Sequence, residues 1–519
     1  SAASDVYKRQ QAYREIIAIR KQWFQVSEDV EQEHQKELAE LRKEVKQERE
    51  LRFKAEKKLN DEKDKNTELR QKYSAALEGM EEKDGIILKL RAQMNRDYEN
   101  SSIPSSKSFK NKKISNSREK TGKKPGAQPG HKGHCRKKQE ITEEPILIPP
   151  PQTVHDDSDF KKTSKTVVKQ HIAIRIELDV KNYYAHVYYN SKTGERIHGA
   201  FPEGVINDVN YDGSIKAFLS LLTMDCNVSI DNARNFLSEM TGGKLNISKG
   251  MVSNLLKEFS HKTEQERKKL IADLMISPVM HIDNTNAKVN GKNAHVFVCA
   301  SPDGKALFSA RKNKGHNGVK GTPAEDYQGI LVHDHDRTFY SYGLNHQECL
   351  AHILRYLKDD IANEPELTWH KEMYTLIQDM IHYRNSRSDD DEPDVEKAVE
   401  FEEKYEKVLE KAKKDYEYLP PNKYYRDGYN LYSRLEKYKS NHLLFLYDYR
   451  VPATNNMAER LLRKYKRKQQ QAVTFRSQEN TEFLCDCMSM LVMMRLNKEV
   501  NIFDRVSQIF RKGKPMVLT

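Results

Sequence analysis

Residues 11 to 97 carry a heptad repeat that no proline interrupts, and this repeat narrows the possible structures more than any other feature. Glu and Lys fill the flanking positions, and a polar Asn66 on the apolar seam is a common register-fixing device. The pattern predicts a coiled coil, and therefore dimerisation, with a solvated single helix as the alternative. Apolar residues recur at seven-residue steps, among them Ile17, Phe24, Leu38, Val45 and Leu59.

The ten residues before the repeat, Ser1 to Gln10, resemble the translation of a sequencing-library adapter that ends in a transposon mosaic end. We therefore expect a non-native scar there and a longer natural chain, and we set these residues aside in reasoning about the fold.

The positive charge of the chain is concentrated in one segment. The chain has a formal net charge of +12. Between Lys107 and Lys138 there are twelve Lys or Arg against one acid, Glu119, a net charge of +11. Residues 98 to 152 are rich in Ser, Lys, Gly and Pro, so they predict a basic linker without a packed core. Such a linker favours a polyanionic partner, although charged tracts can also be merely solvated.

The compartment follows from cysteine content and hydropathy. Six cysteines scattered over 519 residues predict no disulfide framework and a reducing cytoplasm. No run of about 18 apolar residues occurs, so no membrane partner is expected. The length suggests about three or four folding units.

Two apolar runs end in an acid. Residues 278 to 283 predict a short buried strand that delivers Asp283 at a turn, and residues 329 to 333 predict another that ends at Asp334. Asp336 lies two residues further on, beside Arg337. Of these two acids, we favour Asp334 as the one that would bind a metal ion. Strands over 294–301 and 305–311 are predicted to pair through Pro302-Asp303-Gly304.

A later helix supplies a third acid. Pro452 sets its first turn and Thr454 can cap it. Asn455, Asn456, Glu459 and Arg463 then share one face, because their spacings are three and four. Carboxylates at neighbouring strand ends, with an acid on a later helix, suit two-metal phosphodiester chemistry. The alternative is a charged surface helix that happens to contain two Asn. A basic run suited to phosphates follows, comprising Arg460, Arg463, Lys464, Lys466, Arg467 and Lys468.

Taken together, several motifs resemble those of the large transposase of the insertion-sequence-66 family, a DDE transposase with a ribonuclease-H-like core. The stretches that carry the resemblance are Gly122–Gly133 (GKKPGAQPGHKG), Asp283–Thr285, Leu331–Asp334, Cys349–His352 with Arg355, Thr454–Arg460 and Phe475–Ser477.

The resemblance implies a ribonuclease-H-like α/β catalytic core with a large helical insertion, in a bacterial, nucleoid-associated protein. It implies metal-dependent cleavage at the ends of a mobile element and transfer of the freed 3′-hydroxyl into target DNA, with two Mg²⁺ or Mn²⁺ ions. Partners would be double-stranded DNA, a second copy through the coiled coil, and possible accessory proteins of the same element. Asp283, Asp334 and Glu459 would be the catalytic acids and metal ligands, supported by Asn455, Asn456, Arg460 and Arg463. The candidate DNA-binding residues are Lys123, Lys124, His131, Lys132, Arg136, Lys137, Lys138, Lys466, Arg467, Lys468 and Arg476.

The sequence predicts eight consecutive segments. A small β-hairpin module is expected over 153–210, from strands 172–178 and 183–189. The zinc site that the family often carries there is expected to be lost, because no cysteine lies between Cys135 and Cys226. The expected segments are 1–10 scar, 11–97 coiled coil, 98–152 basic linker, 153–210 hairpin module, 211–270 helical region, 271–365 first part of the core, 366–448 helical insertion and 449–512 second part of the core.

Two smaller patterns keep more than one interpretation. Helices over 230–240 and 250–260, the second capped by Ser248, fit either a helix-turn-helix that reads DNA or simple helical packing. Cys349 and His352 predict a helix N-terminus packed under the active site, because a zinc site would need two more ligands.

Two other function classes stay open at this level. The chain could be a catalytically inactive transposase derivative that binds DNA, or a coiled-coil scaffold whose linker binds nucleic acid. In the scaffold, the three acids would have no reason to bind Mg²⁺ or Mn²⁺, so a metal titration separates it from the enzyme.

Overall fold

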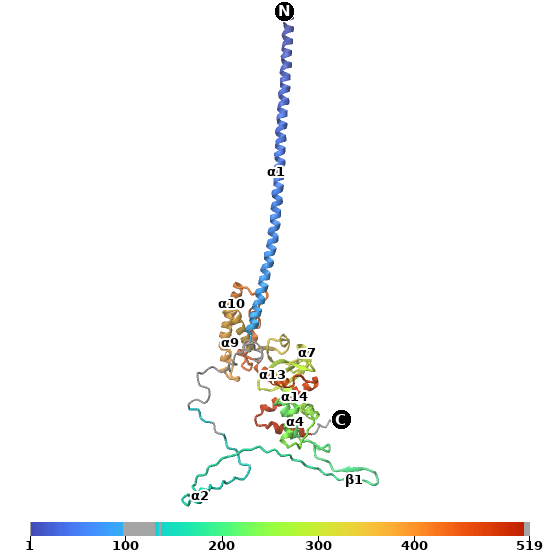
Figure 1. Cartoon of the computed structure of the whole chain (residues 1–519), viewed down its shortest axis with the longest axis vertical. Helices are drawn as coiled ribbons and strands as arrows, with labels where there is room; N and C mark the ends of the chain where they lie inside the picture. The colour runs from blue at the N-terminus through green and yellow to red at the C-terminus, as the bar shows by residue number, and fades with distance from the viewer. Residues whose placement is uncertain (1, 97–129, 134–135, 513–519) are drawn as a thin grey trace. The chain divides into compact units, whose positions relative to one another are not determined.

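The computed structural model describes residues 2–96, 130–133 and 136–512. The contacts within the chain divide it into two compact units. The first comprises Ser1–Arg91 with Pro421–Arg426, and the second comprises Ala92–Pro420 with Asp427–Thr519. Figure 1 labels the elements named below.

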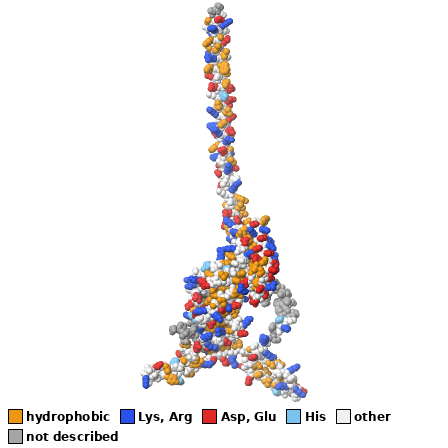
Figure 2. Space-filling view, turned by 180° about the vertical axis from the view of Figure 1, so that it is seen from behind, with side chains coloured by type: hydrophobic (Ala, Val, Ile, Leu, Met, Phe, Trp, Pro, Cys, Tyr) orange, Lys and Arg blue, Asp and Glu red, His pale blue; other side chains and the backbone are white. Residues whose placement is uncertain are grey.

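The first unit consists mainly of the helix α1, Ala2–Asn95. This helix begins nine residues before the predicted start at residue 11, so it includes most of the stretch expected to be a scar. The apolar residues of the heptad repeat are exposed along the helix, with Phe24 at 74% and Leu59 at 54%. Figure 2 shows hydrophobic side chains interspersed with charged ones along it. An isolated helix gains little stability from such exposed side chains.

The hairpin predicted before residue 210 forms elsewhere than expected. Residues 172–178 form no strand, and all but the last are exposed, which corrects the prediction. The strands are instead β1, Val187–Tyr189, and β2, Arg196–His198, which pair antiparallel. The turn between them explains the shift. Asn190 Oδ1 accepts the N–H of Lys192 at 2.9 Å, and Gly194 adopts φ 74°. Before this hairpin lies the short helix α2, Gln152–Asp156.

Four helices precede the sheet: α3 (Gly213–Met224), α4 (Ile230–Met240), α5 (Lys249–Lys262) and α6 (Glu264–Ile276). The predicted cap of α5 is confirmed, since Ser248 Oγ accepts the backbone N–H of Met251 at 3.1 Å. Buried apolar residues of α3, α4 and α5 pack with Leu491 of α14 (Gln478–Leu496) and Val506 of α15 (Ile502–Arg511). This packing accounts for the apolar faces of the helices without any DNA.

The fold is mixed α/β, with one five-stranded mixed sheet beside these helices. Its strands are β3 (Val279–Val289), β4 (Lys292–Ala300), β5 (Ala306–Arg311), β6 (Ile330–His333) and β7 (Asn345–Glu348). They lie in the order β5-β4-β3-β6-β7. The first three pair antiparallel, whereas β6 runs parallel to both β3 and β7.

Strand β3 is longer than predicted, so Asp283 lies within a strand and not at a turn. Asp283 is opposite Val298 of β4, and pairing continues to Val289. The chain reverses at Asn290 and Gly291, which have φ of 48° and 73°. Asn-Gly at these angles is the strongest short signal for a tight hairpin. The real turn therefore lies seven residues beyond the acid.

Helices cover both faces of the sheet. On one face, alternate residues such as Val296 and Val298 pack against Leu461 of α13 (Asn456–Ala472) and Leu484 of α14. On the other face, Ile282 and Phe297 lie in one cluster with Leu274 of α6. Since side chains alternate along a strand, His281 and Asp283 lie on the α13 face.

A helical region separates β7 from α13. It comprises α8 (Leu350–Asn363), α9 (Trp369–Asn385), α10 (Val395–Tyr418), α11 (Asp427–Lys437) and α12 (Lys439–Tyr447). These helices share one apolar cluster with Val332 of β6 and Val451 before α13. This helical region therefore packs beside β6, the strand that Asp334 follows. Among the described helices, none combines the length and apolar character needed to cross a bilayer.

Candidate active site

Strand register brings the first two acids together. Parallel pairing joins Val279–His281 of β3 to Ile330–Val332 of β6, with His281 opposite Val332. Asp283 and Asp334 each lie two residues beyond that last pair. The same register therefore places them side by side at the end of β6.

Asp336, the competing acid, is already engaged. Its Oδ1 accepts the backbone N–H of Thr338 at 3.1 Å and caps the short 3₁₀ helix Arg337–Ser341. Its Oδ2 pairs with Lys314 Nζ at 3.0 Å. This local role favours Asp334 as the acid available to a metal, in line with the sequence-based preference.

Glu459 reaches the site from the first turn of α13. Its side chain is 14% exposed and lies near one imidazole and two guanidinium groups. His352 Nε2 lies 3.4 Å from Oε1, Arg355 Nη2 lies 3.7 Å from Oε2, and Arg463 Nη2 lies 3.2 Å from Oε2. Despite these neighbours, Oε1 is buried without a hydrogen-bond donor among the described residues.

The three acids influence one another electrostatically. Burial, together with the charges of Asp334 and Glu459, raises the pKa of Asp283 from 3.8 to about 8. Burial also raises the pKa of Asp334. Crowded carboxylates with an unpartnered buried oxygen are destabilising by themselves, and a divalent cation would relieve both features. The residues present therefore fit a divalent metal.

Asn455 connects the elements that carry the acids. Its side chain is fully buried. Nδ2 donates to the carbonyl oxygen of Ile282 at 2.8 Å, and Oδ1 lies 2.9 Å from His281 Nδ1. Its backbone N–H donates to Cys349 Sγ at 3.1 Å, at the start of α8. One residue thus fixes α13 to β3 and to α8.

The structure separates the other predicted supporting residues. Helix α13 begins at Asn456 and its N-cap is Asn455, so the predicted cap Thr454 and first-turn Pro452 both lie before the helix. The N-cap side chain cannot cap, because it is committed to β3. Asn456 and Arg460 are exposed. Of this group, only Arg463 touches an acid.

Sequence reasoning missed several neighbours of the acids. The fully buried Glu348 at the end of β7 accepts from His335 at 2.7 Å through Oε1, and from Arg434 and His442 at 2.6 Å and 3.1 Å through Oε2. His335 directly follows Asp334, so Glu348 links that segment to the insertion. No local pattern marked Glu348, whereas the Cys-x-x-His spacing did predict that the helix start with His352 packs under the active site. Helix α8 does begin here as predicted: Cys349 occupies its N-cap position, but the thiol makes no capping hydrogen bond.

The predicted DNA-binding residues have different environments. Lys466 Nζ donates to the backbone oxygen of Asn286, and Lys468 Nζ donates to Gln471 at 2.8 Å. Burial lowers the pKa of Lys468 to about 8. Arg467 and Arg476 are exposed, as are Arg460 and Arg463 on the same helix as Arg467. In the linker, His131, Lys132 and Arg136–Lys138 are exposed, and Lys123 and Lys124 lie outside the described residues.

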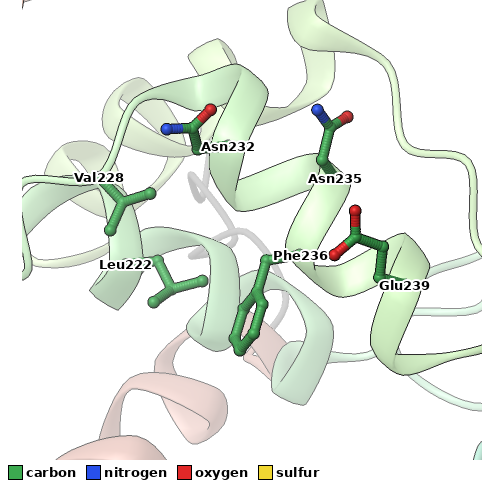
Figure 3. A pocket seen from close by; sticks show the side chains of 6 residues that line it. All are labelled: Leu222, Val228, Asn232, Asn235, Phe236 and Glu239. Atoms are coloured by element: carbon green, nitrogen blue, oxygen red, sulfur yellow. The ribbon is translucent and has the colours of Figure 1, made fainter.

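A separate hollow lies on α3 and α4 (Figure 3). Phe236, 47% exposed, stacks on Phe218 with ring centroids 6.1 Å apart. None of the three acids lines this hollow, so it is not part of the acid cluster. Its lining residues are Leu222, Val228, Asn232, Asn235, Phe236 and Glu239.

Part of the chain is similar to a known protein family. Residues 230–482, which run from the start of α4 into α14 and include all three acids, match the family model described as Transposase IS66 family. The region that these residues form is therefore a transposase domain by class. Within that class it belongs to the IS66 family. No curated protein matches the chain.

Proposed function

We propose that this transposase cleaves DNA at the ends of a mobile element and joins the freed 3′-hydroxyl to target DNA, with Asp283, Asp334 and Glu459 as metal ligands. One observation carries the proposal: the parallel register of β3 and β6 brings Asp283 beside Asp334, and the charges of Asp334 and of Glu459 on α13 add to burial in raising the pKa of Asp283. The strand order is 3-2-1-4-5 in chain sequence, and only the second strand runs antiparallel to the other four, which supports a ribonuclease-H-like core.

The proposed reaction has a cleavage step and a joining step. Two divalent ions, when bound, would supply an activated water and stabilise the leaving oxygen. Water attack on the phosphorus would break the bond to the 3′-oxygen, leaving a 3′-hydroxyl and a 5′-phosphate. That hydroxyl would then attack a target phosphate and displace the target's own 3′-oxygen. Asp283 must lose its proton before it can hold a cation, because its pKa lies near 8.

Arginine residues on α13 support the placement of DNA beside the acids. Arg460, Arg463 and Arg467 are exposed at spacings of three and four, so they form one stripe along the helix. Arg463 Nη2 lies 3.2 Å from Glu459 Oε2, so this stripe passes beside one of the acids. A guanidinium group binds phosphate in a bidentate manner, which fits a DNA backbone running along this stripe.

The acids can be tested one at a time. Replacing Asp283, Asp334 or Glu459 by Ala should abolish metal-dependent cleavage of end DNA while binding to DNA persists, because these acids hold metal and not phosphate. Asp336→Asn is the matched control and should keep most cleavage, whereas Asp334→Asn should lose it. Cleavage that survives in a triad variant would remove that residue from the proposal, and loss in Asp336→Asn with survival in Asp334→Asn would reverse the choice.

The same experiment separates the remaining function classes. An inactive derivative would bind end DNA but would not cleave it in the wild-type form either. A scaffold would show no Mn²⁺ binding that depends on Asp283.

A further inference from the structure

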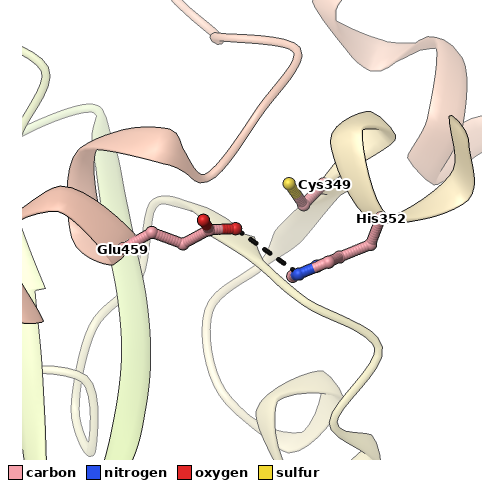
Figure 4. A group of neighbouring side chains, drawn as sticks. All are labelled: Cys349, His352 and Glu459. Carbon is pink, nitrogen blue, oxygen red and sulfur yellow. Dashed lines mark ion pairs between the residues drawn. The ribbon is translucent and has the colours of Figure 1, made fainter. Parts of the chain in front are cut away.

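His352 faces the unpartnered oxygen of Glu459 from the first turn of α8. The distance between His352 Nε2 and Glu459 Oε1 is 3.4 Å. Figure 4 shows the imidazole and the carboxylate pointing toward one another, with Cys349 beside them. The contact is not a hydrogen bond, since Oε1 has no donor among the described residues. In the part of the chain that the structure describes, Oε1 thus lacks a hydrogen-bond donor although a ring nitrogen lies close to it.

The separation of these two atoms suits joint coordination of one ion. Two ligand atoms bound at about 2.1 Å lie about 3.0 Å apart at a right angle and about 3.6 Å apart at 120°. The observed 3.4 Å falls between these values. Side-chain exposures of 20% for His352 and 14% for Glu459 leave the pair accessible yet shielded.

Cys349 lies in the same cluster but does not fit as a ligand. Its Sγ accepts the backbone N–H of Asn455 at 3.1 Å, and the residue is fully buried. Metals bind the thiolate, and a buried thiol without a cationic partner stays protonated. The candidate donors are thus one nitrogen and one carboxylate oxygen, which excludes a sulfur-rich structural zinc site.

We propose that His352 is a nitrogen ligand of the divalent ion held by Glu459, and that this site therefore favours Mn²⁺ over Mg²⁺. The inference rests on the proposed function and goes beyond it by adding a fourth ligand. Mg²⁺ prefers oxygen ligands and retains its waters, whereas imidazole suits transition metals. A neutral imidazole in place of water thus shifts the preference toward Mn²⁺.

Electron spin-echo envelope modulation of Mn²⁺ bound to the full-length protein tests directly whether a histidine nitrogen coordinates the ion. Protein with ¹⁵N-labelled histidine should show a ¹⁵N coupling to the bound ion. His352→Gln should lose that coupling and bind Mn²⁺ about tenfold more weakly, with a smaller loss for Mg²⁺. The matched control is His316→Gln, an exposed histidine that bonds to the Tyr342 hydroxyl, and it should keep both coupling and affinity.

A second variant guards against misfolding. His352→Asp offers oxygen in place of nitrogen, so it should bind metal without the coupling and prefer Mg²⁺ relative to the wild type. Circular dichroism melting curves verify that each variant is folded.

Each contrary result has a distinct meaning. Wild-type protein that binds Mn²⁺ without histidine coupling overturns the inference and leaves the proposed function intact; His352 would then be only an ion-pair partner of Glu459. Coupling that persists in His352→Gln assigns the nitrogen to another histidine and also overturns it. Mn²⁺ binding that is unchanged by Asp283→Ala would instead contradict the proposed function.

Discussion

The side-chain amide of Asn455 donates a hydrogen bond to the backbone oxygen of Ile282 at 2.8 Å, one residue before the acid Asp283. Four positions further along α13, Glu459 turns toward the same site. The spacing between an acid on a strand and an acid on a helix is thereby set by a single buried amide.

Replacing Asn455 by Ala should therefore affect both stability and chemistry. The Ile282 carbonyl and the His281 ring nitrogen would lose their partners in a buried setting, which costs about 1–3 kcal/mol. Denaturant unfolding should show this loss, and metal-dependent cleavage of end DNA should fall. The exposed neighbour Asn456 is the matched control, and Asn456→Ala should change stability by less than about 0.5 kcal/mol. Equal effects of the two substitutions would contradict the positioning role of Asn455.

Asp283 should destabilise the metal-free protein at neutral and alkaline pH. Its pKa is raised to about 8 from 3.8, so between these values the folded state holds a proton that the unfolded chain has released. Stability then falls as pH rises through that window. At pH 8 with EDTA, the free energy of unfolding of Asp283→Asn should exceed that of the wild type by about 1–5 kcal/mol, so the variant should unfold at a higher temperature. This difference should shrink toward pH 4. Saturating Mn²⁺ should reverse the order, because only the wild type gains binding energy.

The buried Glu348 should stabilise the link between the insertion and the segment that carries Asp334. Burial alone would raise the pKa of Glu348, but hydrogen bonds from His335 and His442 and the charge of Arg434 lower it well below its usual range. Its contribution is therefore present above the unfolded pKa of about 4.3 and is lost as pH falls.

Glu348→Gln leaves Arg434 without its anion and should cost about 3–5 kcal/mol at pH 7. Cleavage should fall as well, since His335 adjoins Asp334. Glu402→Gln removes a more exposed pair with Lys439 at 2.8 Å, and it should cost less than about 1 kcal/mol. Thermal unfolding at pH 7 and pH 4 compares the two. A deficit for Glu348→Gln that does not shrink at low pH would rule out this electrostatic origin.

Sequence reasoning located the acids better than it described their surroundings. Apolar runs identified β3 and β6, because continuous hydrophobic residues mark buried parallel strands. The extent of β3 was missed, since Asn290-Gly291 carries the turn and Asp283 itself does not. Strand β7 was missed because its residues, Asn345 to Glu348, are polar, although the last two are buried beside the neighbouring helices.

The roles within the candidate site were harder to separate. Asn455 and Asn456 are identical in sequence, yet the first is fully buried and the second exposed, because only the first lies against β3. His352 and Arg355 reach Glu459 across more than 100 positions of chain, which no local pattern encodes. Charge patterning predicted a DNA-binding run, but packing against β3 engages Lys466 and leaves Arg467 exposed.

The basic linker should contribute sequence-independent affinity for DNA. Neutralising Lys123, Lys124, Lys132, Arg136, Lys137 and Lys138 should weaken binding to all duplexes and flatten its salt dependence. Each lost phosphate contact removes about 0.9 from the slope of log affinity against log salt. Fluorescence anisotropy with specific and random duplexes measures both quantities. An unchanged slope would make the linker only a tether.

The exposed heptad face of α1 should be covered by a second copy of the chain. Joining two ends of a mobile element requires two active sites held together, and the apolar residues of α1 are exposed in the single chain. Deleting residues 11–97 should therefore convert a dimer into a monomer by light scattering. Substitution of seam residues is the finer test. Leu38→Gln with Val45→Gln should weaken the dimer, because both lie on the apolar seam. Glu37→Gln with Glu44→Gln changes the flank next to the seam and should leave it intact. A deletion that remains dimeric would place the interface in the second unit.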